Sequence, residues 1–202
     1  MTYADAVRLQ KNIAKKVVAT KDDFDNISSI CGVDIAYSSS NSNTAYCSAV
    51  IMDRNMQKLI ESVDVQTIVK YPYVPGLLML REAEPIFYTL KLLKNTYELL
   101  LIDGHGLLHP RKCGLACYIG VTLDKPTIGV AKSRLCGRVR PDGFVELDGE
   151  ILGYAISKKL YISVGHRLTL KTAIVLVKEL GIEPLRLADI NSKMNKKKRA
   201  LD

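Results

Sequence analysis

The sequence predicts an α/β fold: a mixed β-sheet with three antiparallel strands followed by parallel strands, flanked by helices. Three strand-like segments come first, at 27–37, 45–52 and 58–68, and short polar turns separate them. Such spacing is typical of an antiparallel meander. Beyond residue 76, apolar strands alternate with helical segments, which indicates parallel strands joined by crossover helices.

The chain begins with an amphipathic segment, 3–18, which we expect to be a helix. One face carries side chains at a spacing of three and four residues: Tyr3, Ala6, Val7, Gln10, Ile13, Ala14 and Val17. The turns between the three strands are predicted at 38–44, which is rich in serine and asparagine, and at 53–55.

The second part of the chain alternates between the two kinds of element. We expect a helix at 77–94, in which Pro85 causes a kink or lies early in a restarted helix. Strands are predicted at 98–103, 127–131 and 161–164, with helices at 114–123 and 168–180 and a hairpin at 144–154 that turns at Asp148 and Gly149. Residues 190–202 are expected to form a basic tail, solvated and frayed from Lys193 onward, on one domain that spans 1–202.

Composition limits the classes of function. The net charge is +8, from 29 Lys and Arg against 21 Asp and Glu, and this excess favours a polyanionic partner such as nucleic acid. No apolar run reaches the length of a membrane span, and the start of the chain lacks the pattern of a secretory signal, so we expect a cytoplasmic protein. The five cysteines form no CxxC pair and are expected to be small buried side chains.

Carboxylates interrupt two of the apolar strands. Asp34 lies within the strand 27–37, and Asp103 ends the strand 98–103, where ligands gather in sheets of this kind. A lysine partner for Asp34 and a turn role for Asp103 are the alternatives. In the helix 77–94, Glu82 and Glu84 are competing candidates for a third acid, the other being a solvated surface residue. Three converging carboxylates would need a divalent cation, and oxygen ligands favour Mg²⁺ or Mn²⁺.

Several longer motifs resemble those of one known family, endonuclease V, the deoxyinosine-specific endonucleases. The resemblance spans about residues 31–189 in the family's motif order. The matched segments are 32–37, 71–82, 103–106, 109–116, 126–133 and 163–167. Six segments in the same order are far more specific than any short motif alone.

The resemblance implies a ribonuclease-H-like fold and a metal-dependent endonuclease of DNA repair. Members of the family nick a strand at the second phosphodiester bond 3′ to a deaminated adenine, leaving 3′-hydroxyl and 5′-phosphate ends. The implied cofactor is Mg²⁺, with Mn²⁺ as a substitute, and the implied partner of the monomeric protein is DNA containing deoxyinosine. Inosine-containing RNA stays open as a target, and no membrane is expected to take part.

The resemblance also assigns residues. Asp34, Glu82 and Asp103 would be catalytic metal ligands, Asp189 a fourth acidic ligand, and Lys132 a catalytic contact to the scissile phosphate or to the attacking water. We call residues 72–76 the wedge turn, because Tyr73 would fill the gap left by a flipped base, although a core tyrosine is the alternative. The expected substrate-binding residues are Pro72, Tyr73, Val74, Pro75, Gly76, Leu78, Gly104, His109, Arg111 and Gly114.

Two other functions fit some of the same features. A non-catalytic nucleic-acid-binding module would explain the positive charge and the basic tail without using the acidic residues. A ribonuclease-H-like nuclease of different substrate choice would use the acids without needing the wedge turn. A comparison of substrates separates these alternatives from an inosine-specific enzyme.

Overall fold

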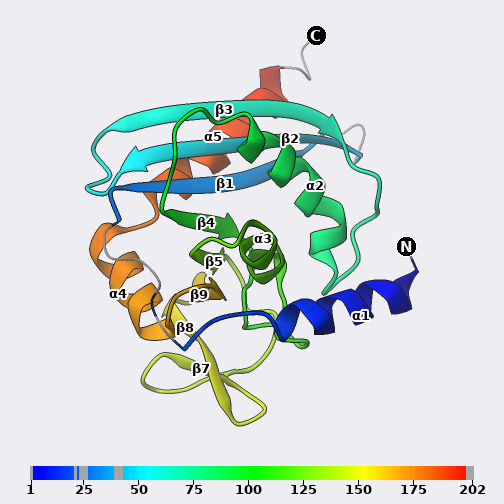
Figure 1. The fold of residues 1–202 in the computed structure, drawn as a ribbon, viewed down its shortest axis with the longest axis vertical. Coiled ribbons are helices and arrows are strands. Elements are labelled where there is room, and N and C mark those ends of the chain that lie inside the picture. Colours follow the sequence, from blue (N-terminus) through cyan, green and yellow to red (C-terminus); the bar gives the residue numbers. More distant parts are fainter. Residues whose placement is uncertain (1, 21, 23–26, 39–42, 199–202) are drawn as a thin grey trace.

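A mixed β-sheet forms the centre of the computed structural model, which describes residues 2–20, 22, 27–38 and 43–198. In this part of the chain the strand order is β3-β2-β1-β4-β5-β9-β8-β7-β6 (Figure 1). The strands are β1 (Ser29–Tyr37), β2 (Thr44–Asp53), β3 (Leu59–Ile68), β4 (Leu99–Asp103), β5 (Thr127–Ala131), β6 (Arg138–Val139), β7 (Phe144–Leu147), β8 (Glu150–Ser157) and β9 (Leu160–His166). The predicted fold class is confirmed.

The first three strands pair as the predicted antiparallel meander. Strand β2 is buried along almost its whole length because β1 and β3 flank it, whereas the edge strand β3 alternates between exposed and half-buried side chains. The turn predicted at 38–44 includes residues 39–42, which lie outside the described part of the chain.

Parallel pairing is confined to the centre of the sheet. Strand β4 is parallel to both β1 and β5, and the helices α2 (Leu78–Lys91) and α3 (Leu115–Leu123) lie in the connections. Helix α2 runs through Pro85 as one element, and the Thr89 hydroxyl donates to the Pro85 carbonyl at 2.9 Å. The predicted restart at Pro85 is therefore wrong.

Beyond β5 the sheet becomes antiparallel again. Strand β9 runs antiparallel to β5, and β8, β7 and β6 follow it in the same manner. The hairpin between β7 and β8 turns at Asp148 and Gly149, as predicted, and both residues have positive φ angles, of 52° and 79°. Two central residues of this kind form the tight turn whose twist matches that of the strands.

Helices cover both faces of the sheet. Helices α2 and α3 lie on one face, with α1 (Tyr3–Ala14) packed against α3, and α4 (Leu170–Leu180) and α5 (Glu183–Lys198) lie on the other (Figure 1). Helix α1 ends four residues before the predicted Val18. The amide of Val18 donates to His166 Nδ1 at 3.2 Å, and its carbonyl accepts from the Arg167 amide at 2.7 Å. These bonds hold the chain in an extended path along the end of β9.

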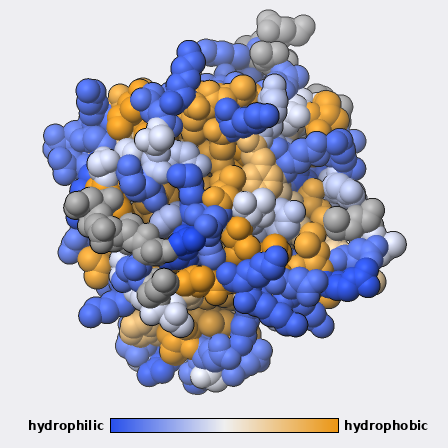
Figure 2. All heavy atoms as spheres, in the orientation of Figure 1, coloured by the Kyte–Doolittle hydropathy of each residue, from blue (hydrophilic) through white to orange (hydrophobic). Residues whose placement is uncertain are grey.

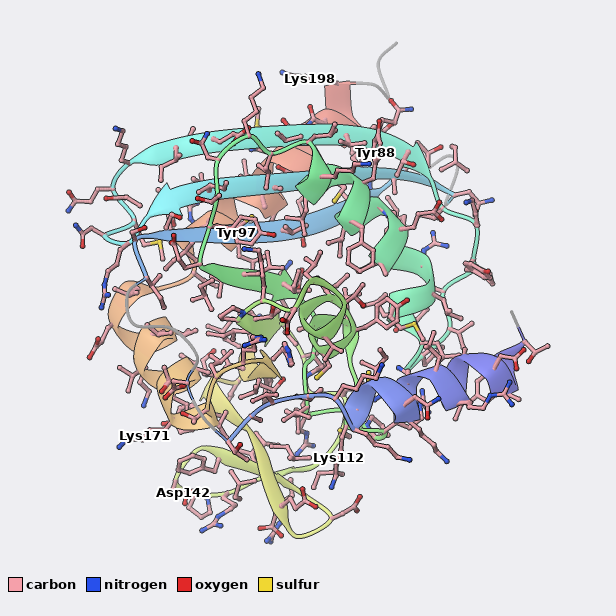
Figure 3. All side chains as sticks on the ribbon, in the orientation of Figure 1. Tyr88, Tyr97, Lys112, Asp142, Lys171 and Lys198 are labelled. Carbon is pink, nitrogen blue, oxygen red and sulfur yellow. The ribbon has the colours of Figure 1, made fainter. Side chains whose placement is uncertain are left out.

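Helix α5 corrects the prediction of a frayed tail. Residues Lys193 to Lys198 continue the helix, whose end at Lys198 lies at the far end from the β6–β7 turn at Asp142 (Figure 3). Only Pro184, Leu185, Ala188 and Ser192 of this helix are buried, so its apolar stripe was too narrow to stand out from the sequence. The predicted frayed position of Arg199 lies outside the described residues.

The surface on the α2 side is mostly hydrophilic. Figure 2 shows hydrophobic residues gathered in the middle of this face, and Leu80, Phe87 and Tyr118 there line a shallow groove between α2 and α3. Cys31, Cys47, Cys113 and Cys117 are buried free thiols, as predicted, and Cys136 is half-buried. Among the described helices, none combines the length and the apolar character needed to cross a bilayer.

Candidate active site

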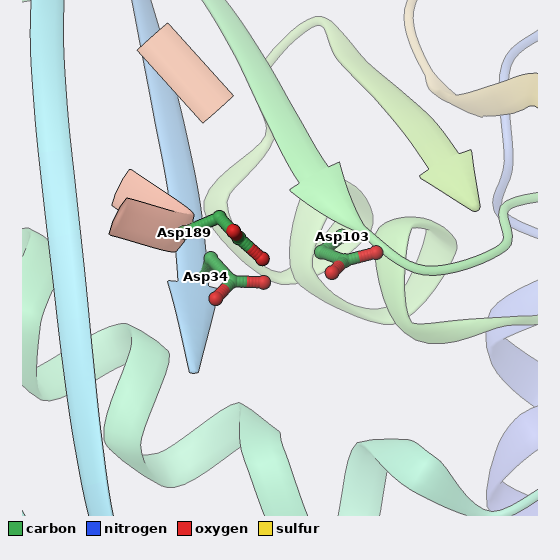
Figure 4. Close-up of side chains that lie close together, drawn as sticks. All are labelled: Asp34, Asp103 and Asp189. Carbon is green, nitrogen blue, oxygen red and sulfur yellow. The ribbon is translucent and has the colours of Figure 1, made fainter. Parts of the chain in front are cut away.

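Three aspartates meet at one edge of the sheet, and we call them the acidic cluster: Asp34, Asp103 and Asp189. Their ligand oxygens lie within 4.8 Å of one another, and Figure 4 shows the three side chains turned toward a shared space. Asp34 and Asp103 follow the paired residues Val33 and Ile102 of the parallel strands β1 and β4. Because the two strands run in the same direction, the two carboxylates lie side by side, with Asp103 at the end of β4 and Asp34 three residues before the end of β1.

The third carboxylate reaches the cluster because α5 crosses β1 at Gly32. A Cβ at Gly32 would lie only 2.2 Å from the backbone nitrogen of Leu185, so only glycine permits this crossing. Asp189 follows Leu185 by one helical turn, and Asp34 follows Gly32 by two residues on the same face of β1. The Ser192 hydroxyl lies 2.9 Å from Asp34 Oδ2 and 3.0 Å from the Asp189 carbonyl oxygen, and it donates to one of them at a time.

Two lysines neutralise part of this charge. Lys132 Nζ lies 2.7 Å from Asp103 Oδ2, 2.7 Å from Asp189 Oδ1 and 4.0 Å from Asp34 Oδ1. Lys193, one turn beyond Asp189, contacts both oxygens of that carboxylate, at 2.7 and 2.6 Å. The Lys132 ammonium thus lies where a cation faces all three carboxylates. Since the donors are all carboxylate oxygens, the cluster fits a hard divalent ion.

Burial and crowding shift the acid–base behaviour of these groups. Burial, with a hydrogen bond and repulsion from Asp103, raises the pKa of Asp34 to about 8. Burial alone would raise the pKa of Asp189, but hydrogen bonds from Lys132 and Lys193 lower it. Burial opposes the charged form of Lys132 as well, yet its bonds to Asp103 and Asp189 outweigh this and raise its pKa. The raised pKa keeps Asp34 mostly protonated near neutral pH, and its ionisation would set three carboxylates against two lysines.

Glu82 approaches from α2, on the other face of the sheet. Its Oε1 accepts a hydrogen bond of 2.9 Å from the Tyr37 hydroxyl, and it lies outside the group of carboxylates within 4.8 Å. Burial, reinforced by Asp103, raises the pKa of Glu82 to about 7 despite the Tyr37 bond. Glu84 points to solvent and pairs with Lys70 at 2.7 Å. Of the two candidates, Glu82 is the one beside the acidic cluster.

One cavity of about 320 Å³ joins the acidic residues to the wedge turn. Its lining includes residues from α1, β1, α2 and the loops after β4 and β5. The sequence-predicted residues among them are Asp34, Tyr73, Gly76, Leu78, Glu82, Asp103, Gly104, His109, Gly114 and Lys132. Asp189 lines the small adjoining pocket that also contains Asp103 and Lys132.

The wedge turn presents an exposed aromatic ring. Tyr73 is 64% exposed between the exposed Pro72 and Pro75, so it is not a core tyrosine. The turn is closed by a hydrogen bond of 2.9 Å from the Leu77 amide to the carbonyl of the half-buried Val74. Gly76 has a φ angle of 75°, which favours glycine, and a Cβ there would lie 2.9 Å from the Arg111 side chain.

The loop after β4 lines the cavity next to the wedge turn. A Cβ at Gly114 would lie 2.1 Å from the His105 carbonyl oxygen, so glycine lets the start and the end of this loop pack against each other. The Gly104 amide donates to Val130 at 2.9 Å, which holds the loop at the end of β5. Arg111 is turned toward the Gly76 carbonyl oxygen, at 2.6 Å, rather than into open solvent.

Sequence reasoning missed several residues of this site. Gln10, from α1, lines the cavity, and Ser192 and Lys193 contact the acidic cluster. A signal for Gln10 was present, because it is a polar residue on the otherwise apolar face of the first helix. For Ser192 and Lys193 no comparable signal existed, since the helix that carries them was not recognised.

A mixed sheet with carboxylates gathered at the ends of neighbouring parallel strands, open to a cavity beside an aromatic turn, defines the class of phosphodiester-cleaving nucleases. Residues 11–190 match the family described as Endonuclease V. The chain belongs to the endonuclease V family, and the resemblance stated from the motifs is confirmed.

Individual relatives agree along almost the whole chain. The endonuclease V of Sulfurisphaera tokodaii is 42% identical over 195 residues, covering 95% of both chains. That of Thermofilum pendens is 38% identical over 200 residues, covering 92% of this chain and 85% of its own.

Two solved structures show the same architecture. The endonuclease V of Streptomyces avermitilis superposes with a TM-score of 0.87 at 28% identity, covering 98% of this chain and 95% of its own. The Ciona intestinalis endonuclease V, in complex with a 24mer DNA containing an inosine followed by a ribo-adenosine, has a TM-score of 0.85 at 27% identity and covers 96% and 98%.

Proposed function

We propose that the protein is a metal-dependent endonuclease that nicks DNA at the second phosphodiester bond 3′ to a deaminated adenine. The products would carry 3′-hydroxyl and 5′-phosphate ends. The observation that carries this proposal is the single cavity that joins the acidic cluster to an exposed aromatic wedge, in a chain of the endonuclease V family. The inosine-containing DNA bound by the Ciona intestinalis relative supports the choice of substrate.

The proposal gives the acidic residues the role of metal ligands. Asp34 and Asp103 would hold Mg²⁺, or Mn²⁺ in its place, with Asp189 on the side of α5 and Glu82 on the side of α2. When bound, the divalent ion neutralises charge on the phosphate and lowers the pKa of an attacking water. The proposed need for a cation is supported by the raised pKa of Asp34 and of Glu82, since burial, with Asp103 nearby, disfavours their charged forms unless positive charge is present.

The remaining residues would grip the strand. The Lys132 side chain is 62% exposed on the open side of the acidic cluster, where its ammonium can donate to a phosphate oxygen. Tyr73 would fill the stack behind the flipped base, while Gly76, Leu78, Gly104, His109 and Gly114 line the space for that base. Pro72, Val74 and Pro75 hold the Tyr73 ring forward, which limits the conformational entropy lost on binding.

A nicking assay tests the proposal. A labelled duplex with one deoxyinosine, incubated with the protein and Mg²⁺, should yield one product whose length places the nick at the second bond 3′ to the lesion. DNA ligase should reseal the nick, because ligation requires a 3′-hydroxyl and a 5′-phosphate. Equal cutting of the unmodified duplex, or full cutting in the presence of EDTA, would contradict the proposal.

The same assay addresses the choice of nucleic acid. A matched single-stranded RNA with one inosine, compared at equal concentration, shows whether DNA is the preferred target. Binding without any metal-dependent product would favour a non-catalytic module instead. We further propose that the protein acts as a monomer in the cytoplasm. Size-exclusion chromatography with light scattering, alone and with the DNA, tests the first point, and cell fractionation tests the second.

A further inference from the structure

Gln10 on α1 is a fully buried amide, 1% exposed, whose polar atoms all have partners. Its Nε2 donates to the carbonyl oxygens of Cys113, at 2.8 Å, and Gly76, at 3.0 Å. Its Oε1 accepts from Arg111 Nε at 2.6 Å. One side chain therefore ties together α1, the wedge turn and the loop after β4, which are far apart in the sequence.

The Gly76 carbonyl oxygen is the point on which these contacts converge. Besides Gln10, it accepts from Arg111 NH2 at 2.6 Å and from His109 Nε2 at 3.0 Å. The His109 ring can donate from Nε2 because its Nδ1 accepts from the Arg111 amide at 3.1 Å. A carbonyl oxygen has two lone pairs, so three donors leave this atom little freedom to move.

The position of Gly76 determines the position of the Tyr73 ring. Gly76 is the last residue of the wedge turn, and the next residue, Leu77, closes the turn with its bond to the Val74 carbonyl. Tyr73 itself is mostly exposed, so the turn is held at its base rather than at its tip. A shift of the Gly76 carbonyl would move the ring relative to the acidic cluster on the other side of the cavity.

We propose that Gln10 is a positioning residue for lesion recognition, which sets the distance between the wedge turn and the cavity through the Gly76 carbonyl. This assigns α1 to the recognition apparatus, and it rests on the proposed function for the identity of the bound base. The role requires an amide, because the site presents two acceptors and one donor. A carboxylate in its place would face two carbonyl oxygens. An aliphatic side chain would remove the acceptor for Arg111 Nε, the donor to the Cys113 carbonyl and one of the three donors to the Gly76 carbonyl.

The first test is independent of DNA. Amide hydrogen exchange at Leu77 reports whether the base of the wedge turn is held. Gln10→Leu and Gln10→Glu should speed this exchange, whereas Ala6→Gly, a buried change on the same helix that does not touch Gly76, should not do so beyond its global loss of stability. Unchanged exchange at Leu77 in Gln10→Leu would overturn the tether, whatever the substrate of the protein.

The second test measures recognition. A duplex with 2-aminopurine beside the deoxyinosine becomes more fluorescent when the neighbouring base leaves the stack. In an Asp34→Asn background, which prevents cleavage, the Gln10 variants should lose most of this signal. With Asp34 intact, the same Gln10 variants should lose about 10-fold or more of the preference for deoxyinosine over unmodified DNA in kcat/KM. The affinity of the Gln10 variants for Mg²⁺, measured by calorimetry, should stay within about twofold, because a displaced wedge turn leaves the carboxylates of the acidic cluster in place.

The controls separate positioning from simple stability. Ala6→Gly should lower the melting temperature while keeping the preference for deoxyinosine, and the exposed Lys11→Ala should change neither. If Ala6→Gly loses the preference in proportion to its melting temperature, or if Gln10→Leu keeps it, the positioning role is wrong. If the wild-type protein shows no preference at all, the proposed function fails, while the exchange at Leu77 still decides whether Gln10 tethers the turn.

Discussion

The two ends of the cavity are built on opposite electrostatic plans. At one end, carboxylates from β1, β4 and α5 lie within 4.8 Å of one another and are only partly balanced by Lys132 and Lys193. At the other end, the neutral groups of Gln10 and His109, together with Arg111, converge on one backbone carbonyl. At the first end, three carboxylates repel one another when all are ionised. At the second end, the side-chain donors have a backbone acceptor.

The two ends of the cavity therefore differ in what they favour: one favours positive charge, and the other is fixed in shape by hydrogen bonds. Burial, reinforced by Asp103, raises the pKa of Asp34 to about 8, so the acidic end gains most from a ligand that brings positive charge. Burial lowers the pKa of His109 to about 4, with the charge of Arg111 acting in the same direction, so the wedge end keeps a neutral, donating imidazole. The carboxylates of the acidic end therefore favour a bound cation. The hydrogen bonds of the wedge end, by contrast, fix its conformation before substrate binds.

The largest effect should come from removing one acid. Asp34→Asn deletes a charge at the centre of the acidic cluster, so we expect cleavage to fall by about 1,000-fold or more, which corresponds to about 4 kcal/mol of transition-state stabilisation. Binding of inosine-containing DNA should remain within a few-fold, because the wedge end is intact. Asp64→Asn, on the exposed edge strand β3, is the matched control and should cleave normally. Normal turnover by Asp34→Asn would remove the assignment of the acidic end.

A second change attacks the acidic end from a distance. In Gly32→Ala the new methyl group would meet the backbone of α5, and we expect a loss of about 2 to 3 kcal/mol in the free energy of unfolding. Because α5 carries Asp189, cleavage should fall as well, while the wedge end is spared. Gly149→Asn, where no atom lies within 4 Å of the added Cβ, tests the positive φ of 79° alone, and it should cost at most about 1 kcal/mol in urea denaturation because asparagine tolerates this conformation better than other residues with a side chain. If Gly32→Ala is as stable as the wild-type protein, the packing of α5 on β1 does not depend on the close approach of the two backbones at Gly32.

A third change removes the tip of the wedge end. Tyr73→Ala should weaken binding to deoxyinosine DNA by about 2 kcal/mol, or about 30-fold, since the ring would stack in place of the flipped base. The melting temperature should not change, because the ring is 64% exposed. Tyr88→Ala, an exposed tyrosine on α2, provides the control in the same fluorescence-anisotropy titration. Equal losses in both variants would show that Tyr73 has no special part in recognition.

The smallest effect concerns pH and the wedge end alone. The folded protein holds the pKa of His109 at about 4, below its ordinary 6.5, so between these values the unfolded chain binds the proton more readily. Stability from this group is therefore present above pH 6.5 and is lost as the pH falls through 4. Between pH 7 and pH 5 the wild-type protein should lose about 1.8 kcal/mol more than His109→Gln in urea denaturation. Identical pH slopes would show that the imidazole is not held neutral by the fold.

Much of the fold followed from local pattern. The meander, the parallel centre and the β7–β8 turn were expected because alternation, apolar runs and turn residues are short-range signals. The antiparallel group beyond β5 was only partly anticipated, since a short apolar strand such as β9 does not reveal its direction. Helix α5 was missed because four buried residues in sixteen make too weak a periodicity.

The sequence by itself determined the carboxylate within β1, the carboxylate at the end of β4 and the stiff turn around Tyr73, because each of these depends on a few neighbouring residues. The choice of Glu82 over Glu84 came from the family resemblance. Only the tertiary structure decided what joins them. Ser192 meets Asp34 across 158 residues of chain, with Asp189 beside it, because Gly32 lets α5 cross β1. Gln10 reaches Gly76 because α1 packs against α3. Such contacts depend on how closely two backbones approach, and no local spacing along the chain records that distance.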